Sequence, residues 1–164
     1  MGPDERIHTH LVSIWRESKG FFAIGGREGM LFLTDRHVVF VHKTESNMNW
    51  WKAITQRQVV KFIRSKNTMI RHDGYGEDDL AEDLEDERNV EVPFEDIVEI
   101  SHKEESWGSV LVMEYHRGDK REKHQYSVAQ DWVKYPAKEP TKYMRVDWEP
   151  FVEFVKKRRR HLLQ

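Results

Sequence analysis

The sequence predicts a mainly β fold: a bent antiparallel barrel of about seven short strands, capped by one C-terminal helix. Three features of the sequence support this prediction. Two apolar runs flank a polar turn at residues 29–41, a hairpin signal surrounds Gly118-Asp119, and an amphipathic segment occupies residues 147–161. This order of elements is typical of a small barrel that docks onto another molecule.

Length and composition favour one domain covering residues 1–164. The chain has 34% charged and 38% hydrophobic residues and no cysteine, which excludes disulfides and cysteine-based zinc sites. No apolar run approaches the roughly 20 residues that span a bilayer. The first residues lack the apolar core of a secretion signal. We therefore expect a cytoplasmic protein without a transmembrane segment, with peripheral attachment to a membrane as an option.

The net charge of −2 conceals strong segregation of charge along the chain. Residues 46–72 carry six Lys or Arg residues and no acidic residue. Residues 73–87 carry nine Asp or Glu residues and no basic one. A second basic block runs from Lys156 to Arg160.

The first half of the chain contains three predicted elements and an insertion. Residues 7–15 fit a short helix or a strand equally well, and residues 21–24 predict a strand. In the hairpin at 29–41, Asp35 and Arg36 form the turn. One face then carries Leu31, Leu33, Val38 and Phe40, and the other carries Met30, Phe32, Val39 and Val41. Because both faces are apolar, another element must cover the second one, and the segment that follows is the obvious candidate.

That segment, at about 47–66, opens an insertion of residues 46–89 and fits an amphipathic helix. Its apolar stripe consists of Trp51, Thr55, Val59, Phe62 and Ile63. The opposite side carries Arg57, Lys61 and Arg64, with Trp50 on the same basic side. The β-branched run at 58–63 leaves a strand as the alternative. The acidic residues 73–87 predict a loop, with one helical turn through Leu80 and Leu84 as the alternative.

The second half predicts strands at 90–94 and 97–100, then a hairpin with a two-residue turn at Gly118-Asp119. This register pairs Leu111 with Tyr126, Met113 with His124 and Glu114 with Lys123, and directs Leu111, Met113 and Tyr115 into the core. Residues 129–146 predict an irregular connection. Asp147 is a suitable cap for the last helix, whose apolar face comprises Trp148, Phe151, Val152, Val155 and Leu162.

This layout resembles the GRAM and pleckstrin-homology-like (PH-like) domains. The resemblance rests on residues 29–40, on Val92 to Ile100 and on the helix from Trp148 to Arg159, and it covers roughly 20–160 without the insertion. It implies a binding role toward lipid headgroups or proteins. Headgroup-binding members use several basic residues in the first hairpin loop. The corresponding loop here, residues 25–29, has one Arg beside a Glu, which argues against a tight phosphoinositide site.

The sequence predicts no catalytic, cofactor-binding or metal-binding residues. The nine histidines show no metalloprotease spacing and no pairing with a nucleophile, so we expect them to be solvated or on strand surfaces, with His102 in a loop. Glu114 and His116 lie on the opposite face of their hairpin from His124. The glycines at 25–29 precede neither a helix nor a Gly-Lys-Ser/Thr sequence, so no nucleotide motif is present.

We therefore expect a non-catalytic binding module that recognises a protein partner or an anionic membrane surface. The candidate surface comprises Trp50, Arg57, Lys61 and Arg64, with Lys156, Lys157, Arg158 and Arg159 as a second contact. A sequence pI near 6.5 argues against nucleic acid. One alternative is a small enzyme that uses Glu114 or His116 in a pocket beside residues 129–146. Another is a homo-oligomer. The acidic stretch 73–87 is either a solubilising loop or a screen for the basic helix.

Overall fold

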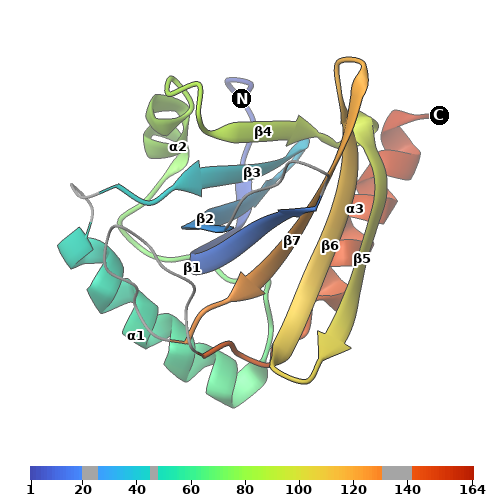
Figure 1. Ribbon diagram of the computed structural model, residues 1–164. Coiled ribbons are helices and arrows are strands. Elements are labelled where there is room, and N and C mark those ends of the chain that lie inside the picture. Colours follow the sequence, from blue (N-terminus) through green and yellow to red (C-terminus); the bar gives the residue numbers. More distant parts are fainter. Residues whose placement is uncertain (20–25, 45–47, 131–141) are drawn as a thin grey trace.

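Figure 1 shows a computed structural model of the chain, which describes residues 1–19, 26–44, 48–130 and 142–164. Seven strands and three α-helices follow one another along these residues. They are β1 (Ile7–Lys19), β2 (Gly26–Thr34), β3 (His37–His42), α1 (Met48–Ser65), α2 (Glu77–Asp83), β4 (Val90–Pro93), β5 (Ile97–Glu105), β6 (Gly108–Arg117), β7 (Lys120–Val128) and α3 (Glu149–Leu162). A 3₁₀ turn at Phe94–Asp96 joins β4 to β5.

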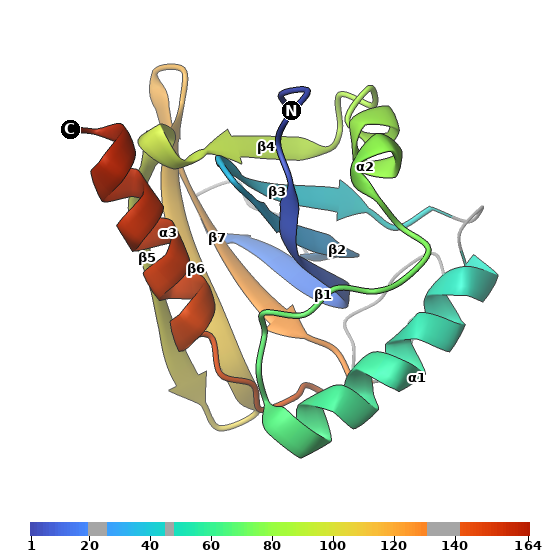
Figure 2. The same ribbon diagram turned by 180° about the vertical axis from the view of Figure 1, so that it is seen from behind.

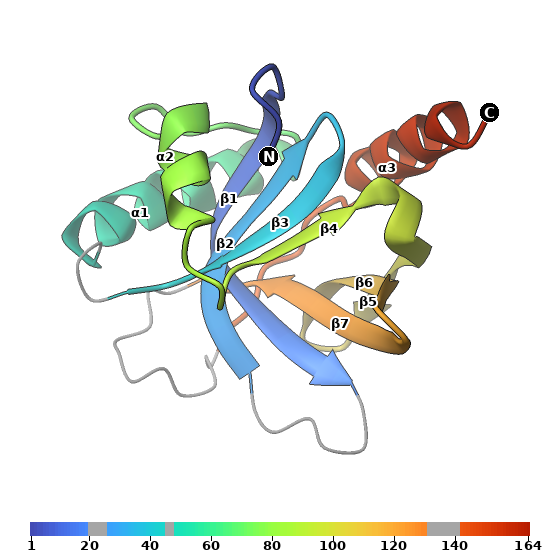
Figure 3. The same cartoon turned by 90° about the horizontal axis from the view of Figure 1, so that it is seen from above.

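The seven strands form one antiparallel sheet in the order β4-β3-β2-β1-β7-β6-β5. The sheet bends round a core without closing, since β4 and β5 are its two edges. Figure 3 shows this bend from above, with α3 beside β5 and β6 and with α1 and α2 on the outer side of β1–β3. The predicted fold class, a mainly β bent barrel with a C-terminal helix, is confirmed.

Residues 7–15 belong to a strand, which settles the choice between helix and strand. Strand β1 pairs with β2 along most of its length, whereas only Ile14–Lys19 pair with β7. A bulge between Leu11 and Ile14 breaks its alternation, and Ser13 there has a φ of 55°. The predicted strand at 21–24 lies outside the described residues.

The residues predicted as the first hairpin loop are mostly part of a strand. Gly26 to Gly29 lie in β2 and pair with β1, so the connection between β1 and β2 precedes them. Glu28 is buried and forms an ion pair with the buried Lys43, with 2.9 Å between Oε1 and Nζ. Its charge therefore stays inside the fold and does not face a ligand at a loop rim.

The hairpin formed by β2 and β3 has two buried faces, as its sequence predicts. Leu31, Leu33, Val38 and Phe40 face the interior of the barrel and pack with α3 and with β5–β7. On the outer face, Met30, Phe32, Val39 and Val41 pack with Trp51 and Ile54 of α1. The segment that follows the hairpin is thus a helix and covers the second face, as expected.

The acidic segment contributes more structure than the predicted loop. Residues 77–83 form the helix α2, and Leu80 is fully buried in the same outer cluster as Trp51. Tyr75 and Leu84 pack against this cluster. One buried leucine in two turns is too weak a periodic signal to indicate a helix. The prediction of a loop therefore followed from the acidic composition of the segment.

Among the described residues, no strand pairs with the N-terminal half of β1 on its β7 side, and the insertion covers it there (Figure 2). The backbone N–H of His10 donates to the carbonyl of Ile70 over 2.8 Å. Arg71 Nη1 donates to the carbonyl of Ile7 over 3.0 Å. At the bulge, Gln58 of α1 bonds both backbone groups of Val12, accepting at 2.8 Å and donating at 2.7 Å. A helix side chain therefore replaces the missing neighbouring strand.

The β6–β7 hairpin has the predicted register. Leu111 lies opposite Tyr126, Met113 opposite His124 and Glu114 opposite Lys123. Gly118 has a φ of 61°, which its turn position requires. Leu111, Met113 and Tyr115 are buried, as expected. His102 lies within β5 and not in a loop, because the strand extends through its charged residues to Glu105.

Helix α3 begins at Glu149, two residues after the predicted cap. The carboxylate of Asp147 still accepts a hydrogen bond from the Glu149 N–H over 3.0 Å. Trp148, Phe151, Val152 and Val155 are buried against the barrel, but Leu162 is 42% exposed. The helix extends past the sheet there, so the predicted apolar face ends at Val155.

Candidate binding surface

The outward side of α1 carries the predicted basic residues together with two exposed aliphatic ones. Arg57, Lys61 and Arg64 are exposed, as the sequence predicts. Val60 is 48% exposed and Ile63 is 70% exposed. We call these five residues the outer face of α1. The side chain of Trp50, the fourth predicted member, lies outside the described residues.

The position of Ile63 corrects the predicted stripe of the helix. Trp51, Ile54, Thr55, Gln58 and Phe62 form its buried side. At about 3.6 residues per turn, Ile63 follows Phe62 by more than a quarter turn and points away from the sheet. Sequence reasoning missed it because hydropathy alone assigned Ile63 to the core.

The cations of this outer face are weakly engaged by the rest of the protein. Among the described residues, Arg57 and Arg64 form no ion pair, and Lys61 Nζ has only a long 3.5 Å bond to the carbonyl of Arg71. Residues 48–72 contain no Asp or Glu. The outer face of α1 is thus a cationic surface with two exposed aliphatic side chains beside it, available to an external anion.

The acidic helix α2 does not neutralise this surface. Figures 1 and 2 show α2 at the β4 end of the molecule, away from the exposed side of α1. Among the described residues, the ion pair between the two charge blocks is that of Arg71 with Glu77, 3.4 Å apart. This arrangement gives no support to the idea that the acidic segment screens the basic helix.

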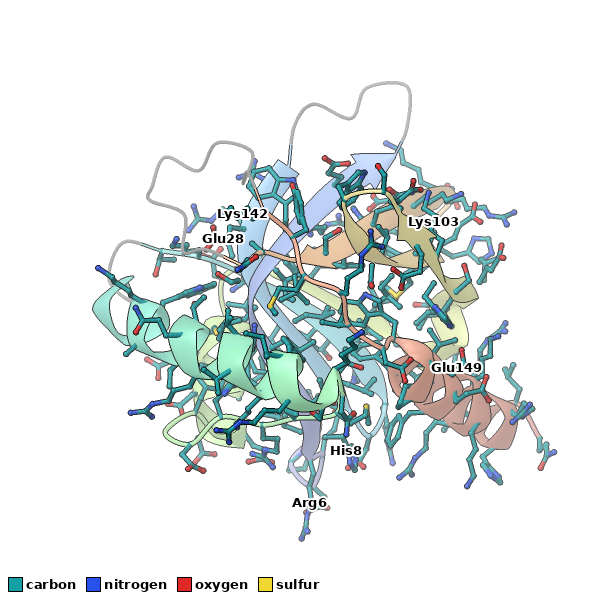
Figure 4. The ribbon with its side chains drawn as sticks, turned by 90° about the horizontal axis from the view of Figure 1, so that it is seen from below. Arg6, His8, Glu28, Lys103, Lys142 and Glu149 are labelled. Carbon is teal, nitrogen blue, oxygen red and sulfur yellow. The ribbon has the colours of Figure 1, made fainter. Side chains whose placement is uncertain are left out.

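The second predicted contact lies on α3 and is separate from α1. The residue after α1 and the residue two before α3 meet where the Asp147 N–H donates to the carbonyl of Lys66 over 2.8 Å, and the helices diverge from that corner (Figure 2). In the view from below, the labelled Arg6 and His8 lie between them (Figure 4). The structure therefore does not merge the basic residues of α3 with the outer face of α1.

Within α3, the four predicted residues differ in their surroundings. Lys156 and Lys157 are exposed. The guanidinium of Arg158 lies 5.1 Å from the centre of the Phe154 ring and 4.0 Å from the Asp35 carboxylate. Arg159 is half-buried, and its Nε has no hydrogen-bond partner among the described residues. Of the four residues, Arg158 therefore contacts other side chains of the protein and Arg159 is half-buried, whereas Lys156 and Lys157 are exposed.

The residues of the enzyme alternative do not converge. Glu114 forms an ion pair with Arg121 on the outer face of its hairpin, 2.7 Å apart, and His116 is exposed near the turn. His124 lies on the inner face, as predicted. Most of the connection 129–146 lies outside the described residues. Within the described part of the chain, no group of three His, Asp or Glu side chains could hold a metal ion.

Three histidines are buried, which the sequence did not predict. His10 stacks on Phe32 with 4.4 Å between ring centres, and the Nε2 of His72 bonds the side-chain carbonyl of Gln58 over 2.9 Å. Burial lowers the pKa of His10 well below its usual value and that of His72 to about 4. Both are therefore neutral at pH 7 and serve as packing and hydrogen-bonding groups.

The third buried histidine, His124, belongs to a set of polar groups on the inner wall of the barrel. Ser18 Oγ lies 3.0 Å from its Nδ1 and Glu122 Oε2 lies 3.3 Å from its Nε2. The hydroxyl of Tyr115 donates to Glu122 over 2.8 Å. The guanidinium of Arg16 is held over the Phe40 ring, 4.6 Å from its centre. We call Arg16, Ser18, Tyr115, Glu122, His124 and Tyr126 the inner polar cluster.

The pairing of Ser18 with His124 contradicts the prediction that no histidine meets a nucleophile. Serine, imidazole and carboxylate are in the order of a catalytic relay. Burial, reinforced by the charge of Arg16, lowers the pKa of His124 to about 4, so its imidazole is a weak base at neutral pH. The signal that could have found this cluster is the period-two sequence Ile14, Arg16, Ser18 on the inner face of β1.

Comparison of the chain with models of known protein families and with curated proteins finds no match. Among the described residues, no helix has both the length and the apolar character that crossing a bilayer requires.

Proposed function

We propose that this chain is a non-catalytic PH-like or GRAM-like binding module that attaches reversibly to anionic membrane surfaces through the outer face of α1. The observation that carries the proposal is Ile63, which is 70% exposed on the same helix as the exposed cations Arg57, Lys61 and Arg64. An exposed aliphatic side chain on a basic helix suits the boundary between headgroups and acyl chains. A flat acidic protein surface would make no use of Ile63.

The expected affinity is modest. Each of the three cations contributes about 1 kcal/mol near an anionic surface, and burial of Ile63 adds about 1.5–3 kcal/mol. The sum of about 4.5–6 kcal/mol corresponds to an apparent dissociation constant of about 0.04–0.5 mM lipid. Such binding is reversible and sensitive to ionic strength. The exposed Lys156 and Lys157 would add a weaker contact, because they lie on the other helix.

Vesicle flotation at millimolar lipid tests the proposal. We expect the protein to float with phosphatidylserine-containing vesicles at low salt, and to stay at the bottom with phosphatidylcholine alone or at high salt. Arg57→Glu with Arg64→Glu should abolish flotation, and Ile63→Ser should weaken it several-fold. Lys120→Glu with Lys123→Glu makes the same charge change on the β6–β7 hairpin and should retain binding.

The outcome decides between the membrane and other partners. Binding that ignores lipid charge and salt, or that survives the Arg57 and Arg64 changes, would refute attachment through α1. Absence of flotation with anionic vesicles at low salt would favour a protein partner. Light scattering on the same samples would detect a homo-oligomer. In that case Ile63→Ser should reduce the measured mass if the outer face of α1 forms the interface between copies.

A further inference from the structure

The inner polar cluster contains a half-buried cation that the described residues do not neutralise. Arg16 lies on the inner face of β1, opposite Tyr126 of β7. Its Nε and Nη1 are inaccessible to solvent and have no hydrogen-bond partner among the described residues. A buried donor without a partner is costly, and a buried charge is normally paired.

The one carboxylate of the cluster is engaged elsewhere. Glu122 accepts hydrogen bonds from Tyr115 and His124, and no described carboxylate lies within ion-pair distance of Arg16. Burial alone would raise the pKa of Glu122, but these hydrogen bonds lower it, so the group is ionised. Burial also lowers the pKa of Arg16, as expected for a cation that lacks a close counter-ion.

Apart from Glu122 and the cation Arg27, which lies opposite Arg16 on β2, the groups around Arg16 are neutral hydrogen-bonding groups and aromatic rings. Burial raises the pKa of Tyr115 and of Tyr126 above the usual range, so both hydroxyls keep their protons, and His124 is uncharged at neutral pH. The rings of Phe40 and Tyr126 are 5.9 Å apart, centre to centre. A guanidinium beside phenolic hydroxyls and aromatic walls matches a carboxylate on an apolar body. The nearby Glu122 disfavours a doubly charged phosphate.

A pocket gives one member of the cluster access to the surface. It has a volume of about 370 Å³ and lies between β4 and the tip of the β6–β7 hairpin. Its walls include Val90, Val92, Tyr115 and Arg117 together with the acidic residues Glu91 and Asp96, and Arg16 itself is not among the residues that line it. Tyr115 therefore contacts the pocket on one side while its hydroxyl bonds Glu122 within the cluster.

We propose that Arg16 binds the carboxylate of a small organic acid with an aromatic or similarly apolar body, inside the barrel and beside Tyr115. This ligand would supply the counter-ion that the described residues do not. The inference is independent of the attachment through α1, because the two sites share no residue and lie on different surfaces of the sheet.

Two measurements on the intact chain test the inference, with benzoate as the probe. We expect calorimetry to show saturable binding of benzoate, and no binding of benzyl alcohol, which lacks the charge. Arg16→Met should abolish binding and, without benzoate, raise the midpoint of thermal unfolding, because an unpaired buried charge is replaced by an apolar chain of similar length. Arg121→Met, at an exposed position on the same hairpin as Tyr115, should keep wild-type binding.

Arg16→Lys is the second variant, and it keeps the positive charge but loses the planar fork. We expect it to fold and to bind benzoate at least ten-fold more weakly. The inference is overturned if Arg16→Met melts below the wild type or does not fold, since Arg16 would then be a structural residue. It is also overturned if Arg16→Lys binds as tightly as the wild type, or if inorganic phosphate binds more tightly than benzoate.

Discussion

Gln58 should be the side chain on which the docking of α1 depends most strongly. Its amide is fully buried and bonds the N–H and the carbonyl of Val12 at 2.8 and 2.7 Å, and it also accepts from His72. Val12 lies in the bulge of β1, where neither β2 nor β7 pairs with it. No strand can therefore take over these bonds when the amide is removed.

The magnitude of the effect follows from this geometry. Gln58→Ala leaves two buried backbone groups unpaired, each at a cost of about 1–3 kcal/mol. Some of this cost is recovered if water enters the space left by the side chain. We therefore expect the free energy of unfolding to fall by about 3 kcal/mol, a large part of the roughly 5–15 kcal/mol typical of a domain.

Urea unfolding followed by circular dichroism measures this change. Gln56→Ala, at an exposed position of the same helix, is the matched control and should change stability by less than about 0.5 kcal/mol. Hydrogen exchange should show the amide of Val12 losing its protection in Gln58→Ala alone. Equal stabilities of the two variants would refute the reasoning, because the clamp on Val12 would then contribute nothing.

Three further predictions concern pH, backbone spacing and helix packing. The pKa of His72 is lowered to about 4 in the fold, and below pH 6.5 the residue takes up a proton on unfolding, so stability should fall by up to roughly 3 kcal/mol as the pH is lowered from about 6.5 to about 4. Thermal unfolding across that range should be less pH-dependent in His72→Gln and unchanged in His116→Gln. Gly29→Ala would place a methyl carbon 2.4 Å from a carbonyl oxygen of the neighbouring strand and should destabilise by about 1–3 kcal/mol in urea; wild-type stability would contradict the close approach. Phe62→Ala should cost about 3–5 kcal/mol and Ile63→Ala close to none, and equal losses would place Ile63 in the core.

Local patterns predicted the parts of the fold in which neighbouring residues decide the structure. The β6–β7 register follows from alternation on both sides of Gly118, whose positive φ fixes the turn. The two apolar faces of the β2–β3 hairpin likewise required a cover, and α1 supplies it. The buried side of a helix could not be predicted in this way, because the sheet against which the helix packs decides which of its residues are buried. Ile63 was therefore assigned to the wrong side, whereas Leu162 is exposed because α3 extends past the sheet.

The candidate sites also differ in whether neighbouring residues or the tertiary fold decides them. The exposed cations of α1 could be predicted because a run of basic residues without acidic neighbours remains in solvent. The inner polar cluster could not, since it brings Arg16 next to Tyr115 and His124 from strands about a hundred residues away in the sequence. Burial of histidine and arginine also opposes their ordinary hydropathy, so no scale of residue preference would place them inside.

The cover that the insertion provides for β1 has a practical consequence for truncation. A chain trimmed to the barrel alone, without residues 46–89, would lose the groups that bond His10, Ile7 and Val12. A row of bare amide and carbonyl groups, beside an uncovered apolar sheet face, is a template for association between copies. Minimal versions of this protein should therefore precipitate, and the insertion is better regarded as a built-in safeguard of solubility than as a removable appendage.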